Sequence, residues 1–306
     1  MYYISGMSAG FHGVTLVMDV TYQNRDVPLC DIHTAESEDE IIALLDRYIG
    51  NFHPSVTVIC KDTNTFNRAF ERFHETESVR HPNLLSTSGS SFTHSFTQST
   101  CFATVTFKYR IEKTVLHKHK LDVDIEVKKL CRTLFFSKMP EEVKILIAHN
   151  YLAQTVEYVD EDHGRLNERS YLQSAYGALI KKECVCQGYA EAFKLLMEHE
   201  GIECHVVVGG SLEHPSEHSN HAWNMITLKN GNGSFHIDVT WDSNLGKGHY
   251  DYFCKQDATF RTSHRWNSEN YPVCNSFYDV KAQADAYIKA NKLLFMLKKI
   301  PRDYYL

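Results

Sequence analysis

The chain has 306 residues, 43% of them hydrophobic, so it can bury a sizeable core, and we expect two domains. Its formal net charge is −6 and it has no long basic block, which argues against a nucleic-acid partner. It contains no run of about 18 apolar residues, so we expect no membrane-spanning segment and no membrane partner.

The first residues match a secretory signal peptide poorly. They lack a basic start, and glycines and His12 interrupt the apolar stretch before Asp19. The nine cysteines are scattered without the regular spacing of a small disulfide-bonded domain, which favours reduced thiols. We therefore expect a cytoplasmic protein, or a secreted one if a leader is missing from the sequence.

Residues 1–115 predict a small α/β domain of unknown role. Ser37 and Glu40 have the spacing of a capping box, and apolar residues follow at helical intervals as far as Gly50. Residues 55–60 alternate like a strand, and a second helix covers residues 66–73. We expect a Ser/Thr-rich loop at 84–100 and a strand at 101–111. No chemical motif occurs in this part.

Residues 116–306 predict a second domain of the α+β class. One helix is expected around 122–136, and another starts at Pro140, a residue suited to the first helical position. A short helix is expected at 170–180. The C-terminal pattern at 279–299 predicts a last helix that ends before Pro301.

Two cysteines, Cys184 and Cys186, precede a helix predicted from Gln187 to Glu200 and stopped by Gly201. Cys186 then lies in the first turn, where unpaired N–H groups and the helix dipole favour a thiolate. A disulfide between cysteines one residue apart is not expected, because its ring is strained. The alternative is structural, since a cysteine that opens a helix is often a buried core residue.

The stretch HAWNMITLKNGNGSFHIDVTWD (221–242) predicts a β-hairpin. A two-residue type I′ turn at Asn230 and Gly231 would place residue 229 opposite residue 232 and fix every pair behind them. His221 would then have both Asp238 and Asp242 as diagonal neighbours on its own face. A turn two residues later would separate His221 from Asp238.

A thiol, an imidazole and a carboxylate are the parts of a Cys-His-Asp arrangement. The imidazole takes the thiol proton, the thiolate attacks a carbonyl carbon, and the carboxylate holds the imidazole tautomer. The spacing leaves both Asp238 and Asp242 open as the carboxylate. It also leaves open whether the thiol meets the hairpin.

Four motifs in this order resemble the transglutaminase-like superfamily of papain-type cysteine enzymes, in particular its bacterial members: VCQGYAEAF (185–193), GIECHVVVGG (201–210), HAWNMI (221–226) and FHIDVTWD (235–242). The resemblance covers about 120–270, roughly half the chain. It implies a helix bearing the cysteine packed on an antiparallel sheet bearing the histidine and the aspartate. It assigns Cys186 as nucleophile, His221 as base and Asp238 as orienting acid, and leaves Cys184 without a catalytic role.

The resemblance further implies cysteine-dependent acyl transfer on peptide or amide bonds through a thioester, without a cofactor. We expect hydrolysis of a protein or peptide substrate. Transamidation, in which a lysine amine resolves the thioester, uses the same residues and is the alternative reaction. A binding module on the same scaffold is the alternative outside enzymology.

Several neighbouring residues have two interpretations. Trp223 and Trp241 either wall the site or are core aromatics, and Gly188 is expected to permit close packing. The backbone N–H of Cys186 is the natural first oxyanion donor, whereas Gln187 and Gln173 are candidates for the second by chemistry alone.

A zinc site is not expected, although the sequence offers ligand types. Histidines gather in the loop before the hairpin, but no paired CxxC set or HExxH motif accompanies them. The residues considered were His214, His218, His221, Cys184, Cys186 and Cys204.

Overall fold

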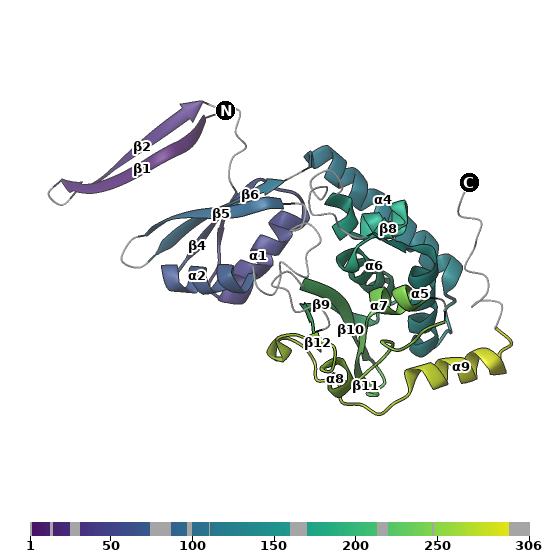
Figure 1. The fold of residues 1–306 in the computed structure, drawn as a ribbon. Coiled ribbons are helices and arrows are strands. Elements are labelled where there is room, and N and C mark those ends of the chain that lie inside the picture. Colours follow the sequence, from purple (N-terminus) through teal and green to yellow (C-terminus); the bar gives the residue numbers. More distant parts are fainter. Residues whose placement is uncertain are drawn as a thin grey trace.

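A computed structural model describes the backbone of residues 2–12, 15–24, 31–73, 87–96, 100–109, 111–159, 170–212, 220–246 and 248–293. The structure mixes helices and sheets, as the sequence predicts (Figure 1). Within these ranges, no helix combines the length and the apolar character that crossing a bilayer requires.

The N-terminal part contains an antiparallel hairpin, β1 (Tyr2–His12) and β2 (Thr15–Asn24), and a four-stranded sheet. The sheet has the order β3-β4-β6-β5, in which only β3 and β4 run parallel. Helices α1 and α2 contact this sheet and share one core with it. The elements are β3 (Ile32–Thr34), α1 (Glu38–Gly50), β4 (Ser55–Cys60), α2 (Thr63–Arg72), β5 (Thr87–Phe96) and β6 (Cys101–Tyr109).

The predicted start of α1 is confirmed, because the Ser37 Oγ accepts a hydrogen bond from the Glu40 N–H at 3.2 Å. The loop predicted at 84–100 is wrong in part, because residues 87–96 form β5. This strand lies at the edge of the sheet and pairs through its backbone with β6 alone. An edge strand does not need apolar residues on both faces, so a Ser/Thr-rich sequence can form it.

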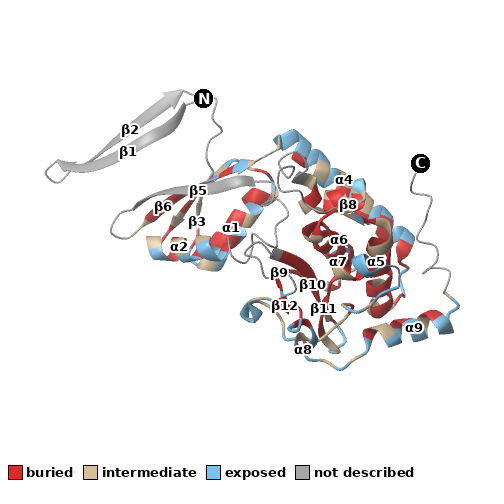
Figure 2. Ribbon diagram, viewed as in Figure 1, coloured by how far each residue is buried: buried red, intermediate tan, exposed pale blue. Residues whose placement is uncertain are grey.

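The remaining elements surround a separate core (Figure 2). Its sheet is antiparallel throughout, with the order β11-β10-β9-β12. Helix α6 contacts β9 and β10 and also α4, α5 and α7. The main elements are α4 (Lys113–Leu134), α5 (Glu141–Thr155), α6 (Cys186–His199), β9 (Glu203–Ser211), β10 (Asn220–Leu228), β11 (Gly233–Ile237), α7 (Val239–Leu245), β12 (His264–Arg265) and α9 (Val280–Ala290).

Short elements connect these larger ones. The pattern predicted as one helix at 170–180 contains a 3-10 turn and a π-helix, so the regular helix expected there is wrong. The short elements are β7 (Glu157–Tyr158), η2 (Ser170–Gln173), η3 (Gly177–Lys181), β8 (Glu183–Cys184), α8 (Asp257–Phe260) and η4 (Ser268–Asn270).

Three helix boundaries differ from the prediction. Helix α4 begins well before residue 122, so the expected domain boundary after residue 115 falls inside a continuous helix. His117, near the start of α4, packs edge-on against Phe52 of the N-terminal part, with 5.0 Å between the ring centroids. Pro140 is the N-cap of α5 rather than its first helical residue. Helix α9 ends at Ala290, and the predicted helical residues from 294 onward lie outside the described ranges.

The predicted register of the hairpin is confirmed, since the β10–β11 pairs run from Asn224–Ile237 to Leu228–Gly233. The predicted type I′ turn is wrong, because Asn230 lacks the positive φ that this turn requires at both central positions. The second strand is also shorter than predicted. It ends at Ile237, and the chain turns directly into α7.

Candidate active site

The N-terminus of α6 places the Cys186 thiol beside the sheet. Cys186 is the first residue of this helix, where backbone N–H groups have no intrahelical acceptor. Its partly exposed side chain packs on a small cluster formed by Ala190 of α6, Val206 of β9 and Ala222 of β10. Because these side chains are short, the start of α6 can approach β10 closely.

Asn224 fixes α6 against β10. Its buried side-chain amide donates hydrogen bonds to the backbone carbonyl of Ala190 at 2.9 Å and to that of His205 at 3.4 Å. One side chain thus ties the helix to strands β9 and β10. The distance between the α6 terminus and the residues of β10 is therefore set by a buried polar contact as well as by packing.

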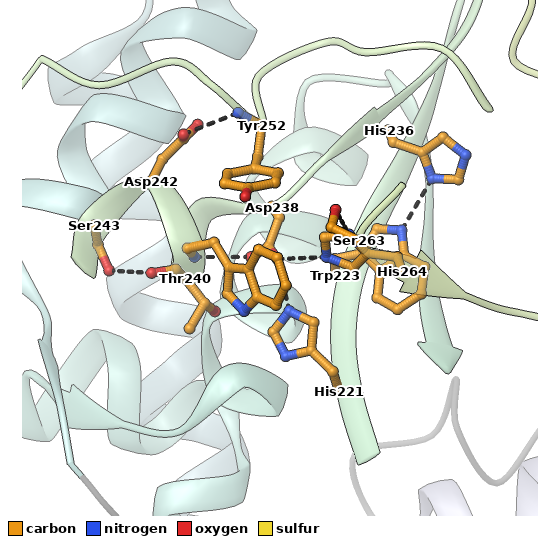
Figure 3. Close-up of polar contacts among 11 residues, drawn as sticks. His221, Trp223, His236, Asp238, Thr240, Asp242, Ser243, Tyr252, Ser263 and His264 are labelled. Atoms are coloured by element: carbon orange, nitrogen blue, oxygen red, sulfur yellow. Dashed lines mark hydrogen bonds and ion pairs between the residues drawn. The ribbon is translucent and has the colours of Figure 1, made fainter. Parts of the chain in front are cut away.

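His221 lies on β10, opposite Gly209 of β9, and its side chain is buried. Its Nε2 lies 2.6 Å from Oδ2 of Asp238 (Figure 3). Since Nε2 faces a carboxylate oxygen, it carries a proton there, and Nδ1 is the nitrogen left for another partner. Cys186 is one of the groups that raise the pKa of His221, which places its thiol near this imidazole.

Asp238 follows β11 directly and caps α7. Its Oδ1 accepts a hydrogen bond from the Trp241 N–H at 3.0 Å, and its Oδ2 accepts from His221 and also from His264 Nε2 at 3.1 Å. The residue is fully buried. Asp238 was expected on a strand; instead, the end of the strand and the start of the helix orient its carboxylate.

The electrostatics favour a charged imidazole–carboxylate pair. Burial alone would raise the pKa of Asp238, but the positive charge of His221 and the imidazole hydrogen bonds hold it below its ordinary value. Burial opposes charge on His221 as well. The Asp238 charge and hydrogen bond, with a smaller contribution from Cys186, nevertheless raise the pKa of His221 to about 10.

Two tryptophans flank the imidazole of His221. Trp223 stacks at 5.8 Å between ring centroids and Trp241 at 5.3 Å. Trp223 is fully buried, and its Nε1–H donates to His236 Nδ1 at 2.9 Å, so it is at once a core residue and a neighbour of His221. His236 in turn bonds Asp257 at 2.8 Å, which fixes the indole indirectly.

Asp242, the carboxylate that the hairpin pattern left open, is engaged elsewhere. It lies in α7, where it bonds His149 Nε2 of α5 at 2.9 Å and accepts the Tyr252 N–H at 3.0 Å. The strand predicted through residue 242 would have placed it beside His221. Because helix α7 rotates the chain after Asp238, only Asp238 bonds His221 among the two acids.

Cys184 is fully buried two residues before Cys186, the first residue of α6. Burial, reinforced by the neighbouring Cys186 and Glu191, raises the pKa of the Cys184 thiol well above its ordinary value. A Cβ on Gly188 would stand 2.5 Å from the Cys184 Cβ and 2.9 Å from its Sγ. The close approach expected at Gly188 is therefore present, and it accommodates Cys184.

The two glutamines considered as oxyanion donors lie in different settings. The amide of Gln187 is buried and donates to Glu191 Oε1 at 3.1 Å, one turn further along α6. Burial raises the pKa of Glu191 to about 8. Gln173 ends η2 and is half-buried, close in sequence to Leu172, whose carbonyl accepts the N–H of Val185.

Potential metal ligands do gather within the described ranges. One group contains His221, Asp238 and His264, whose ligand atoms lie within 4.8 Å of one another. Their separations are those of hydrogen bonds between imidazoles and a carboxylate. His214 and His218, weighed above as zinc ligands, lie outside the described residues.

Sequence reasoning missed three buried polar residues near this site: Asn224, which fixes α6 against β10, His264, which bonds Asp238, and His149, which bonds Asp242. Asn224 lies on a predicted strand, on the same face as the apolar residues Ala222 and Ile226, so its burial could have been anticipated. Its hydrogen bond to Ala190 of α6 could not. His264 and His149 come from segments distant in sequence. No spacing rule connects them with the hairpin.

A comparison with protein families matches residues 128–239 to the Transglutaminase-like superfamily, and this part of the chain is a domain of that superfamily. The matched range contains Cys186, His221 and Asp238. Curated proteins give no match. Among solved structures, one described as "Crystal structure of a TGase" is 14% identical with a TM-score of 0.33, and the match covers 92% of this chain and 78% of that one.

Proposed function

We propose that the transglutaminase-like domain at residues 128–239 catalyses cysteine-dependent acyl transfer on peptide or amide bonds, with water as the acceptor. Cys186 is the nucleophile, His221 the base and Asp238 the orienting acid. The observation that carries this proposal is the His221 imidazole, bonded through Nε2 to a buried carboxylate, with Cys186 at the start of α6 packed against Ala222, the next residue along β10. Helix α6 packed on the antiparallel sheet supports a papain-type core.

The first half of the reaction forms a thioester. Nδ1 of His221 takes the thiol proton, and the Cys186 sulfur attacks the carbonyl carbon of the substrate. The backbone N–H of Cys186 donates to the oxyanion that develops. When the tetrahedral intermediate collapses, the imidazolium gives its proton to the leaving amine, and the acyl group stays on sulfur.

The second half releases the acyl group as a carboxylate. Neutral His221 takes a proton from water, the oxygen attacks the thioester carbonyl, and the thiolate leaves. In both halves the Asp238 charge stabilises the imidazolium, in agreement with the raised pKa of His221. The hydrogen bond to Asp238 also keeps the proton on Nε2, so that Nδ1 remains free to accept.

Partial exposure favours water as the acceptor. Both the Cys186 side chain and Trp241, which stacks on the base, are half-buried rather than sealed from solvent. A thioester reachable by bulk water is hydrolysed unless the site excludes water in favour of an amine. Transamidation by a lysine amine uses the same three residues and is distinguished by experiment.

The test offers both acceptors at once. The full chain is incubated with glutamine-containing blocked peptides and a fluorescent primary amine, and the products are separated by mass spectrometry. Carboxylate products that disappear in Cys186→Ala support hydrolysis, whereas amine-linked products identify a transamidase. If wild type and Cys186→Ala leave every peptide unchanged while binding some of them, the domain is a binding module and the proposal is wrong.

A further inference from the structure

His264 contributes a second imidazole to the site, from outside the range matched to the family. It lies on β12, the edge strand, opposite Ser211 of β9, and its side chain is fully buried. Its Nε2 lies 3.1 Å from Oδ2 of Asp238, the oxygen that also bonds His221 (Figure 3). The carboxylate therefore lies between two histidines.

Aromatic rings fix the orientation of His264. Phe260 stacks on it at 4.5 Å between centroids, Trp241 lies at 4.3 Å, and Trp223 meets it edge-on at 4.8 Å. Packing of this kind leaves the imidazole little freedom to rotate. Its two nitrogens consequently have fixed directions.

Both nitrogens of His264 have partners that suit one neutral tautomer. The Ser263 hydroxyl lies 2.8 Å from Nδ1 and can donate to it, while the protonated Nε2 donates to Asp238. The ring can therefore donate a hydrogen bond to Asp238 as a neutral imidazole. The same carboxylate oxygen receives one bond from a stationary ring and one from the proposed base.

We infer that His264 is a positioning residue, whose Nε2–H bond holds the Asp238 carboxylate in the orientation that aligns His221 with Cys186. The inference rests on the proposed function. Asp238 is anchored at Oδ1 by the Trp241 N–H and at Oδ2 by His264, so that the base approaches a carboxylate already fixed at both oxygens. Preorganisation of this kind removes reorganisation from the reaction step.

A purely structural role would give a different result on substitution. A histidine kept only to fill the aromatic cluster could be replaced by an apolar side chain with loss of stability but not of rate. A positioning histidine requires its N–H, so the side chain that restores an N–H donor should restore the rate. Glutamine carries an amide nitrogen at about the reach of imidazole Nε2, whereas leucine carries none.

The experiment measures acetylation of Cys186 by p-nitrophenyl acetate in wild type, His264→Leu and His264→Gln, at a temperature where circular dichroism shows each variant folded. Loss of one hydrogen bond to a buried charge predicts a rate about ten- to a hundredfold lower in His264→Leu. His264→Gln should recover most of this loss. Ser263→Ala, which only releases Nδ1, is the milder variant that keeps the test decisive if His264→Leu does not fold, and it should slow acetylation several-fold.

His149→Leu is the matched control, because it breaks the other buried histidine–aspartate pair that reaches α7. It should lower stability without slowing Cys186 acetylation. Equal rates in His264→Leu and wild type, or a glutamine variant as slow as the leucine variant, would overturn the role of His264. If wild type itself acquires no acetyl group on Cys186, the proposed function fails instead.

Discussion

Replacing Asp238 by asparagine tests how the carboxylate controls the base. The carboxylate accepts N–H groups at both oxygens, from Trp241 at Oδ1 and from His221 and His264 at Oδ2. An asparagine has one oxygen and one NH₂ group, which cannot accept. Whichever way the amide is oriented, its NH₂ group then faces at least one of these N–H groups, and no hydrogen bond forms there.

Both orientations of the asparagine disable His221. With the amide oxygen toward the rings, His221 loses the charge that raises its pKa, while burial continues to lower it. With the NH₂ toward the rings, His221 must accept at Nε2 and carry its proton on Nδ1, so it cannot take the thiol proton. In the Ser-His-Asp triad, the same exchange traps the wrong tautomer and lowers kcat about 10⁴-fold.

The structure sets the scale of the effect. The difference between a pKa of about 10 and the ordinary 6.5 corresponds to about 5 kcal/mol in favour of the imidazolium. Most of that stabilisation disappears with the charge of Asp238. We therefore expect alkylation of Cys186 by iodoacetamide at pH 7 to slow by at least about a hundredfold.

The assay follows modification of the peptide containing Cys186 by mass spectrometry. Asp257→Asn is the matched control, because Asp257 bonds His236 at 2.8 Å and reaches His221 only through the stacked Trp223. It should alkylate at the wild-type rate. A folded Asp238→Asn protein that alkylates within about threefold of wild type would refute the electrostatic account of the base.

Three further outcomes are expected. Gly188→Ala should lower the free energy of unfolding by about 1–3 kcal/mol, because the new Cβ would overlap the Cys184 Cβ. In urea unfolding, adding Cys184→Gly should recover part of that loss. No loss of stability in the single variant would contradict the overlap. Because the folded pKa of His221 is raised, its contribution to stability is complete below about pH 6.5 and is lost as pH rises through about 10. The difference in unfolding free energy between wild type and His221→Gln should therefore shrink over that pH range. A difference that stays constant would contradict the raised pKa. Cys186→Ala should abolish activity with little change in thermal unfolding, whereas a large drop in Tm would favour a core role.

Local rules predicted the elements whose own residues determine them. The helix predicted from Gln187 to Glu200, observed as Cys186–His199, follows from periodicity and the stop at Gly201, and the register of β10 with β11 follows from the turn position. The prediction failed where a tertiary partner decides. Alternation continues past Ile237, yet a helix begins there, because the Asp238 carboxylate accepts the Trp241 N–H of that helix and also the imidazole N–H groups of His221 and His264, which are distant in sequence.

The buried histidines near the site were beyond reach for the same reason. His264 and His149 each bond an aspartate of the segment after β11, but they arrive from β12 and α5. Their role depends on which elements pack together, and a single sequence carries no spacing that encodes it. The choice of Asp238 over Asp242 likewise came from the family resemblance, and the contacts give its physical reason.

The thioester can be observed directly. Wild-type protein is mixed with p-nitrophenyl acetate, quenched in acid within seconds and mapped by mass spectrometry, with and without hydroxylamine, which cleaves thioesters. The account predicts one acetyl group on the peptide containing Cys186, removed by hydroxylamine and absent from His221→Ala. Acetyl groups spread over lysines and other cysteines, with none enriched at Cys186, would contradict it.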